Sequence, residues 1–194
     1  MRLLLAFAAL KGVWFATLYY SEWTQVVVSG DRCLYPESFH IFTTEICLGN
    51  SHGSSSKRGG PLCLPLDGSE EFDRLPPTED RTLLNFGLLD TVCQMLVISP
   101  LVFVSLKFSA SADNGNGKTD QSFSPFLTPV LHLSCATLAA IAIGAALSAP
   151  TASASHWANG LQTCDVSIVP GAAVPIALIS IFAETALAWT SISN

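Results

Sequence analysis

Hydrophobic residues are concentrated in four long runs along the chain, and polar segments separate these runs. The clearest run extends from Phe126 to Ala149, 24 residues without a single Asp, Glu, Lys or Arg. A helix rises about 1.5 Å per residue, so a helix of this length crosses the roughly 30 Å hydrocarbon core of a bilayer. The run therefore predicts a transmembrane helix.

Three further apolar runs indicate that the whole chain is one membrane domain of the all-α class. Each of them is also long enough to span a bilayer as a helix. Together they predict a single domain over residues 1–194, a bundle of four transmembrane helices with spans at about 3–28, 83–106, 126–149 and 167–189.

The polar segments form two loops on one side of the bundle and a short connection on the other, together with both termini. Within the longer loop, apolar and β-branched side chains alternate around Phe39, Ile41 and Ile46. This alternation predicts a small extracellular β element, a strand or hairpin closed by a disulfide. The loops are expected at about 29–82 and 150–166, and the connection at about 107–125.

Composition and charge narrow the class of protein and its partners. Only 12% of the residues are charged and 49% are hydrophobic, whereas soluble domains carry roughly 25% charged residues. The net charge is −6, and between Ser21 and Thr82 ten acidic residues face five basic ones. A lipid bilayer is therefore the expected surrounding, and a nucleic acid is not an expected partner.

The six cysteines divide by environment. Cys93 and Cys135 lie in apolar runs, and four lie in the two loops: Cys33, Cys47, Cys63 and Cys164. Four cysteines on one side suggest two disulfides in an oxidising compartment, which places both termini in the cytoplasm and the protein in the plasma membrane or another secretory-pathway membrane. The pairing stays open among three connectivities.

The alternative is that the loop thiols are reduced and bind a metal together with histidines. The candidate histidines are His40, His52 and His156. No Cys-x-x-Cys pair or fixed Cys/His spacing supports a zinc site, so no metal or cofactor is expected.

Four polar residues lie inside the apolar runs, where a charge facing lipid costs on the order of 2.5–3.5 kcal/mol. Lys11, His132 and Glu184 fall at similar depths in the half of the bundle near the termini. We therefore expect Glu184 to pair with Lys11 or His132, and Asp90, near the other face, to have its own partner. The alternative is a proton or cation path through Asp90, His132 and Glu184.

Small residues recur at every fourth position of the third run, at Ala136, Ala140, Gly144 and Ser148. Such a ridge permits close packing of helices in lipid. The favoured interpretation is that it packs inside the chain's own bundle. A helix of another membrane protein is the alternative.

No catalytic motif of a hydrolase, metalloprotease, nucleotide-binding or redox enzyme occurs in the sequence. We therefore expect a non-enzymatic protein. The four spans, the long first loop, Trp23 after the first span and the Cys33…Cys47 pair resemble the claudin-like four-span superfamily, which includes claudins and γ-type auxiliary subunits of ion channels. The resemblance implies a left-handed four-helix bundle capped by a small antiparallel sheet that a disulfide ties.

The function expected from these features is that of an accessory or assembly subunit of a larger membrane complex, such as an ion channel, receptor or transporter. A claudin-like adhesion or barrier protein acting through the 29–82 loop is the first alternative. A small proton or cation transporter is the second, because of Asp90, His132 and Glu184.

Overall fold

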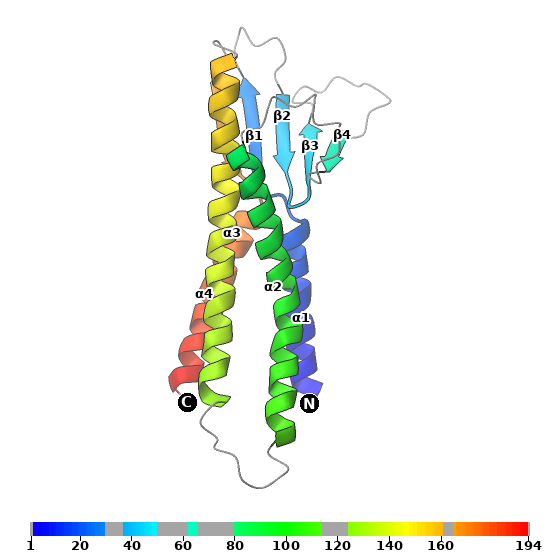
Figure 1. Cartoon of the computed structure of the whole chain (residues 1–194), viewed down its shortest axis with the longest axis vertical. Helices are drawn as coiled ribbons and strands as arrows, with labels where there is room; N and C mark the ends of the chain where they lie inside the picture. The colour runs from blue at the N-terminus through cyan, green and yellow to red at the C-terminus, as the bar shows by residue number, and fades with distance from the viewer. Residues whose placement is uncertain are drawn as a thin grey trace.

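Four helices form an elongated bundle, and an antiparallel sheet lies at one end of it (Figure 1). The computed structural model describes residues 2–29, 37–49, 62–65, 80–113, 124–160 and 165–193. Both chain termini lie at the end opposite the sheet (Figure 1). The helices are α1 Arg2–Tyr20, α2 Asp80–Asp113, α3 Ser124–Gly160 and α4 Ala173–Ser193.

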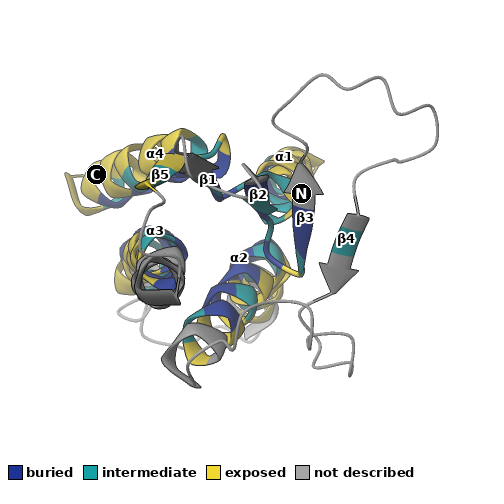
Figure 2. Cartoon of the chain, turned by 90° about the horizontal axis from the view of Figure 1, so that it is seen from above, coloured by how far each residue is buried: buried dark blue, intermediate teal, exposed yellow. Residues whose placement is uncertain are grey.

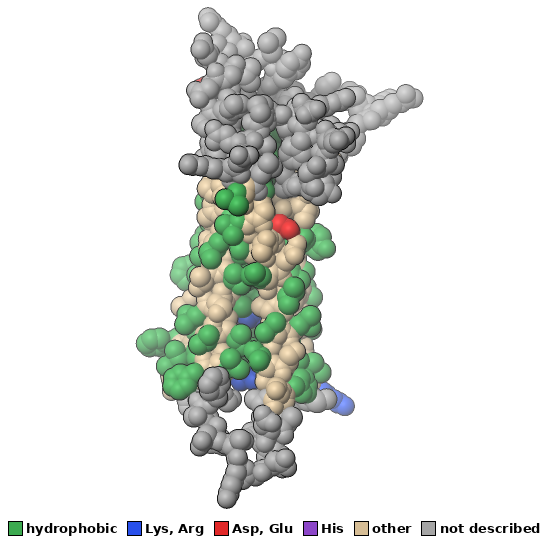
Figure 3. Space-filling view, in the orientation of Figure 1, with side chains coloured by type: hydrophobic (Ala, Val, Ile, Leu, Met, Phe, Trp, Pro, Cys, Tyr) green, Lys and Arg blue, Asp and Glu red, His purple; other side chains and the backbone are tan. Residues whose placement is uncertain are grey.

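All four helices are long and apolar enough to cross a membrane, as the sequence predicts. Their large apolar side chains point outward: Leu3 is 86% exposed, Phe126 73% and Phe182 75%. Figure 3 shows hydrophobic side chains over the visible face of the bundle, with few charged groups among them. A bundle with this outer surface fits an apolar surrounding.

The centre of the bundle is filled by side chains from all four helices. Phe15 and Leu18 of α1 and Leu96 of α2 are buried, and α3 and α4 add closely packed alanines. Viewed from above, the buried residues lie on the facing sides of the helices (Figure 2). Small side chains on α3 and α4 allow their backbones to approach closely, which favours association of helices in lipid.

Five strands form the sheet in the order β4-β3-β2-β1-β5, and every neighbouring pair is antiparallel. The expected hairpin is confirmed as β2 and β3, and its side chains Phe39, Ile41 and Ile46 are buried. The segment between α1 and α2 supplies four strands and the segment between α3 and α4 supplies the fifth, so the sheet joins the two segments. The strands are β1 Thr24–Ser29, β2 Glu37–Ile41, β3 Glu45–Gly49, β4 Leu62–Pro65 and β5 Asp165–Pro170.

The expected spans at 3–28 and 167–189 are wrong at their sheet ends. Helix α1 stops at Tyr20, because the β-branched run that follows forms β1. Helix α4 starts at Ala173, because residues from Asp165 to Pro170 pair with β1 as β5. Hydropathy alone does not separate an apolar strand from the end of an apolar helix.

The second loop is also shorter than the expected 150–166. Helix α3 continues to Gly160, and glycine is a common residue at helix C-termini. This upper part of α3 rises beside β1 at the sheet end of the molecule (Figure 1). At the opposite end α2 runs on to Asp113, past the expected limit of the 83–106 span.

Candidate functional site

A buried charge cluster joins three helices in the half of the bundle near the termini. Lys11 Nζ of α1 lies 3.0 Å from Glu184 Oε2 of α4, and His132 Nδ1 of α3 lies 2.6 Å from the same oxygen. All three side chains are less than a tenth exposed. The structure thus brings Lys11 and His132 together onto Glu184, whereas the depths in the sequence indicated one partner or the other.

A second polar link lies about one turn from this cluster. Trp14 Nε1 donates a hydrogen bond of 2.6 Å to Ser180 Oγ, which in turn donates to the Ile176 carbonyl. Trp14 is three residues after Lys11, and Ser180 is four residues before Glu184, so both links lie on one face of each helix. This pair is not among the sequence predictions, although the matching spacing of its residues from Lys11 and Glu184 is a usable signal.

The ring of Phe103, from α2, forms the apolar wall of the charge cluster. Lys11 Nζ and Lys107 Nζ each lie 5.9 Å from its centroid, and the His132 ring is 5.9 Å away, centroid to centroid. Both ammonium groups are within the range of a cation–π interaction. Sequence reasoning did not single out Phe103, because a phenylalanine in an apolar run carries no distinguishing pattern.

Asp90 stands apart from the charge cluster. Its two carboxylate oxygens accept hydrogen bonds from Tyr19, at 3.1 Å, and from Gln94, at 2.7 Å. Lys11 and Tyr19 are eight residues apart on α1, or about 12 Å along the helix, and Phe15 and Leu18 fill the interval as buried apolar side chains. The structure therefore does not join Asp90 to His132 and Glu184.

The small-residue ridge of α3 lies largely outside the bundle core, so the favoured interpretation of internal packing is wrong for most of it. Ala136 is buried, whereas Ala140, Gly144 and Ser148 are exposed. A Cβ atom placed on Gly144 would meet nothing within 4 Å. The buried face is offset by one residue and carries a different set of small residues: Cys135, Ala139, Ala142, Ala146 and Ala149.

The sheet is fixed to the bundle by buried hydrogen bonds around Trp23. The Trp23 indole donates to Thr43 Oγ1 at 3.2 Å, and that hydroxyl donates to the Tyr19 carbonyl at 2.7 Å. Thr24 Oγ1 donates to the Ala146 carbonyl of α3 at 3.0 Å. These contacts connect the first strand and the β2–β3 turn to α1 and α3, so the sheet cannot shift without breaking buried polar contacts.

The disulfide of the sheet joins β3 to β4. Cys47 and Cys63 are directly opposite in the register and are bonded, with a Cα–Cα distance of 4.0 Å. Of the three connectivities left open, the bond selects the one that pairs Cys47 with Cys63, and it excludes the Cys33…Cys47 pair on which the resemblance to the claudin-like superfamily rests. Cys33 and Cys164 lie outside the described residues, while Cys93 and Cys135 are free and buried.

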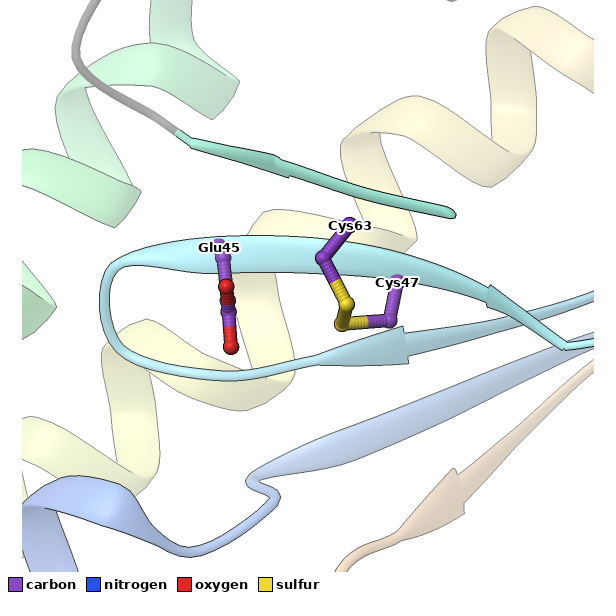
Figure 4. Close-up of side chains that lie close together, drawn as sticks. All are labelled: Glu45, Cys47 and Cys63. Carbon is purple, nitrogen blue, oxygen red and sulfur yellow. A yellow bond between two sulfur atoms is a disulfide. The ribbon is translucent and has the colours of Figure 1, made fainter. Parts of the chain in front are cut away.

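Glu45 lies beside this disulfide on β3, and the three side chains are close enough to surround a metal ion (Figure 4). Thiolates are the metal-binding form of cysteine, and here each sulfur is bonded to the other. In the disulfide form the group offers one carboxylate as a ligand, which is too few for a zinc site.

No protein-family model and no curated protein sequence matches this chain.

Proposed function

We propose that this chain is a non-enzymatic four-span membrane protein that serves as an accessory or assembly subunit of a larger integral membrane complex, such as an ion channel, receptor or transporter. The observation that carries the proposal is the exposed small-residue face of α3, formed by Ala140, Gly144 and Ser148.

Membrane insertion is supported by the distribution of side-chain sizes. Large apolar residues face outward on each helix, and alanines fill much of the core of α3 and α4. In water, the exposed apolar surface of four such helices would drive aggregation. In lipid the same surface is solvated, and the buried charge cluster keeps its ionic groups away from the acyl chains.

The disulfide supports one orientation of the bundle in the membrane. The Cys47–Cys63 bond lies in the sheet, and both termini lie at the opposite end (Figure 1). Disulfides persist in oxidising compartments. The sheet therefore faces the exterior or the lumen of a secretory-pathway membrane, and the termini face the cytoplasm.

The face of α3 is suited to a partner helix because its backbone is accessible. Lipid chains pack poorly into a shallow groove, whereas the ridge of a second helix packs against it closely. Bulky side chains such as Leu101, Phe182 and Trp189 are exposed on the other helices of the bundle. The proposal therefore assigns this stretch of α3 to the contact with the larger complex.

Purification in a mild detergent, followed by mass spectrometry of the proteins that travel with the chain, tests this assignment. Ala140→Leu and Gly144→Leu should abolish co-purification of a larger membrane protein while the chain itself still folds. Ala183→Leu is the matched control, since Ala183 is exposed on α4. A partner that is lost equally in the control, or retained in both α3 variants, would contradict the assignment.

The sheet supports a second candidate function, claudin-like adhesion or barrier formation. Both loops contribute strands to one sheet, which Trp23 and Thr24 fix to the bundle, so a partner on an opposing membrane would meet a rigid surface. A disulfide-tied sheet above four helices is also the arrangement implied by the resemblance to the claudin-like superfamily. Clustering of the chain at contacts between expressing cells, without a larger membrane partner, would favour this function.

The transporter alternative has less support. A path through Asp90, His132 and Glu184 would have to pass the apolar layer formed by Phe15 and Leu18. Asp90 is held by neutral partners on α1 and α2. Flux measured in vesicles that contain the purified chain is the test of this alternative, and flux abolished by Glu184→Gln in a folded protein would favour it.

A further inference from the structure

Among the described residues, basic groups outnumber acidic groups around Phe103. Two lysines, Lys11 and Lys107, and one imidazole, His132, approach its ring, and a single carboxylate, Glu184, accompanies them. Lys11 and His132 both contact Glu184, so Lys107 is the basic group of this set that the carboxylate does not contact.

Lys107 has no carboxylate partner among the residues whose side chains the structure describes. The ion pairs in that part of the chain involve Lys11, His40 and His132. Lys107 is partly buried, and its ammonium group lies over an aromatic ring. A partly desolvated cation in an apolar setting is stabilised by a counter-anion.

We propose that Lys107 binds the phosphate of an anionic phospholipid in the leaflet near the termini, an inference that rests on the proposed membrane location. The apolar segment of α2 extends from Leu84 to Ser109, so Lys107 lies close to its end, where lipid phosphates meet the hydrocarbon. Anionic lipids are concentrated in the cytoplasmic leaflet and attract cations at this level.

The surroundings of Lys107 match the two parts of such a lipid. Leu101 and Phe108 of α2 are exposed apolar side chains, which would contact the acyl chains. Arg2, at the start of α1, is another cation at the same end of the bundle, and its side chain is exposed. The expected ligand is therefore a phosphate diester attached to a hydrocarbon tail. A free phosphate would contact the cations but not the apolar side chains beside them.

Lipid retention by the full chain tests the proposal. The protein is reconstituted in vesicles of equal parts phosphatidylcholine and phosphatidylserine and extracted into a neutral detergent, and the lipids that remain bound are identified by native mass spectrometry. Wild type should retain phosphatidylserine in excess. Lys107→Gln should lower that excess about fivefold, which corresponds to the ~1 kcal/mol expected for one lysine at an anionic surface.

Controls separate the charge at this position from charge in general. Lys107→Arg should retain the lipid, and Lys118→Gln should behave as wild type, because that lysine lies in the connection beyond the end of α2. Flotation of each variant with the vesicles reports membrane insertion separately. A chain that does not float contradicts the membrane proposal, and a chain that floats without retaining phosphatidylserine contradicts the lipid site alone.

Three further results would overturn the site. The first is equal retention by wild type and Lys107→Gln. The second is displacement of the lipid by inorganic phosphate, which would identify the ligand as a free anion. The third is an excess of bound phosphatidylserine that appears only in Asp113→Asn or Asp120→Asn and not in wild type. That result would mean that the substituted aspartate is the counter-ion of Lys107 in the wild-type chain.

Discussion

Two carboxylates in the bundle, Glu184 and Asp90, are stabilised by different kinds of partner. Glu184 is buried, and one of its oxygens accepts contacts from Lys11 and His132 at 3.0 and 2.6 Å. Asp90 is partly exposed near the sheet and accepts hydrogen bonds from the neutral donors Tyr19 and Gln94. The enclosed carboxylate is paired with a cation, whereas the partly exposed one is stabilised by neutral donors.

This difference indicates where the bundle is most sensitive to substitution. Lys11, His132 and Glu184 come from α1, α3 and α4, so removing one of them leaves an uncompensated group between three helices. Tyr19 and Asp90 connect only α1 with α2, and Gln94 belongs to the same helix as Asp90. The two sites therefore predict unequal effects for chemically identical substitutions.

Glu184→Gln is expected to produce the largest loss of stability. The neutral amide leaves the ammonium group of Lys11 buried without a counter-charge, which costs about 3–5 kcal/mol when one partner of a buried ion pair is removed. The free energy of unfolding, measured in bicelles, checks this value. Trp14→Phe is a control that removes a neighbouring hydrogen bond but no charge, and its expected cost is about 1 kcal/mol.

Lys11→Met combined with Glu184→Gln should recover most of that loss. The double variant removes both charges of the pair, and His132 keeps an acceptor in the glutamine carbonyl. Replacement of a whole buried ion pair by neutral groups is often close to neutral for stability. A double variant as unstable as Glu184→Gln alone would show that the loss has a cause other than the unpaired lysine.

The sequence predicts the helices well and the helix–strand boundaries poorly, for a physical reason. Uncharged runs such as Phe126–Ala149 identify a helix through length and composition. The apolar strands β1 and β5 continue the same hydropathy directly into α1 and α4, and their strand conformation depends on pairing with each other. That pairing is between residues far apart in the sequence, which periodicity cannot report.

The residues of the candidate site show the same division. Lys11, His132 and Glu184 stand out because charge is rare in an apolar run. The small-residue ridge was identified from its spacing, but spacing alone cannot say which face of α3 meets the core, and the buried face is offset to Ala139 and Ala146. The disulfide partner of Cys47 likewise depends on the cross-strand register with β4.

Loss of the sheet disulfide is the next largest expected effect, and it concerns the other end of the molecule. Cys47 and Cys63 are separated by 16 residues, and cross-linking a loop of this length stabilises a fold by about 3 kcal/mol. Replacing both with serine should increase hydrogen exchange in β3 and β4 and leave exchange in α3 near wild type. Faster exchange throughout the bundle would show that the helices depend on the disulfide.

The disulfide map can be checked without any substitution. Peptide mapping without reduction should give a Cys47–Cys63 fragment. Cys33 and Cys164 are then the loop cysteines that remain available for a second bridge. Such a bridge would link the first loop to the second covalently, parallel to the pairing of β1 with β5. A Cys33–Cys47 fragment would contradict the register of the sheet.

Gly171→Ala is expected to cost about 1–3 kcal/mol, the range for forced overpacking. A Cβ atom at Gly171 would overlap the carbonyl group of Glu22. The backbone there cannot easily move, because two hydrogen bonds of 2.8 Å hold it. Gly171 N donates to the Trp23 carbonyl, and Ala173 N donates to the Glu22 carbonyl. Gly144→Ala is the matched control, since a Cβ there meets open space. Thermal unfolding in one detergent compares the two.

The control also separates stability from association. Alanine at position 144 should stabilise the isolated chain by about 0.5–1 kcal/mol, because glycine is unfavourable within a helix. The added methyl group lies on the face proposed to contact a partner helix. Loss of stability in both glycine variants would mean that the space around Gly144 is filled in the folded protein.

Asp90→Asn is expected to have the smallest effect, below about 1 kcal/mol. The asparagine oxygen can still accept one hydrogen bond from Tyr19 or Gln94, and no buried cation loses its counter-ion. Unfolding of Asp90→Asn and Glu184→Gln under the same conditions isolates the role of the surroundings, because both substitutions convert a carboxylate to its amide. An equal loss of unfolding free energy in the two variants would mean that a partly exposed carboxylate with neutral donors matters as much as one enclosed with a lysine. It would contradict the contrast between the two halves of the bundle.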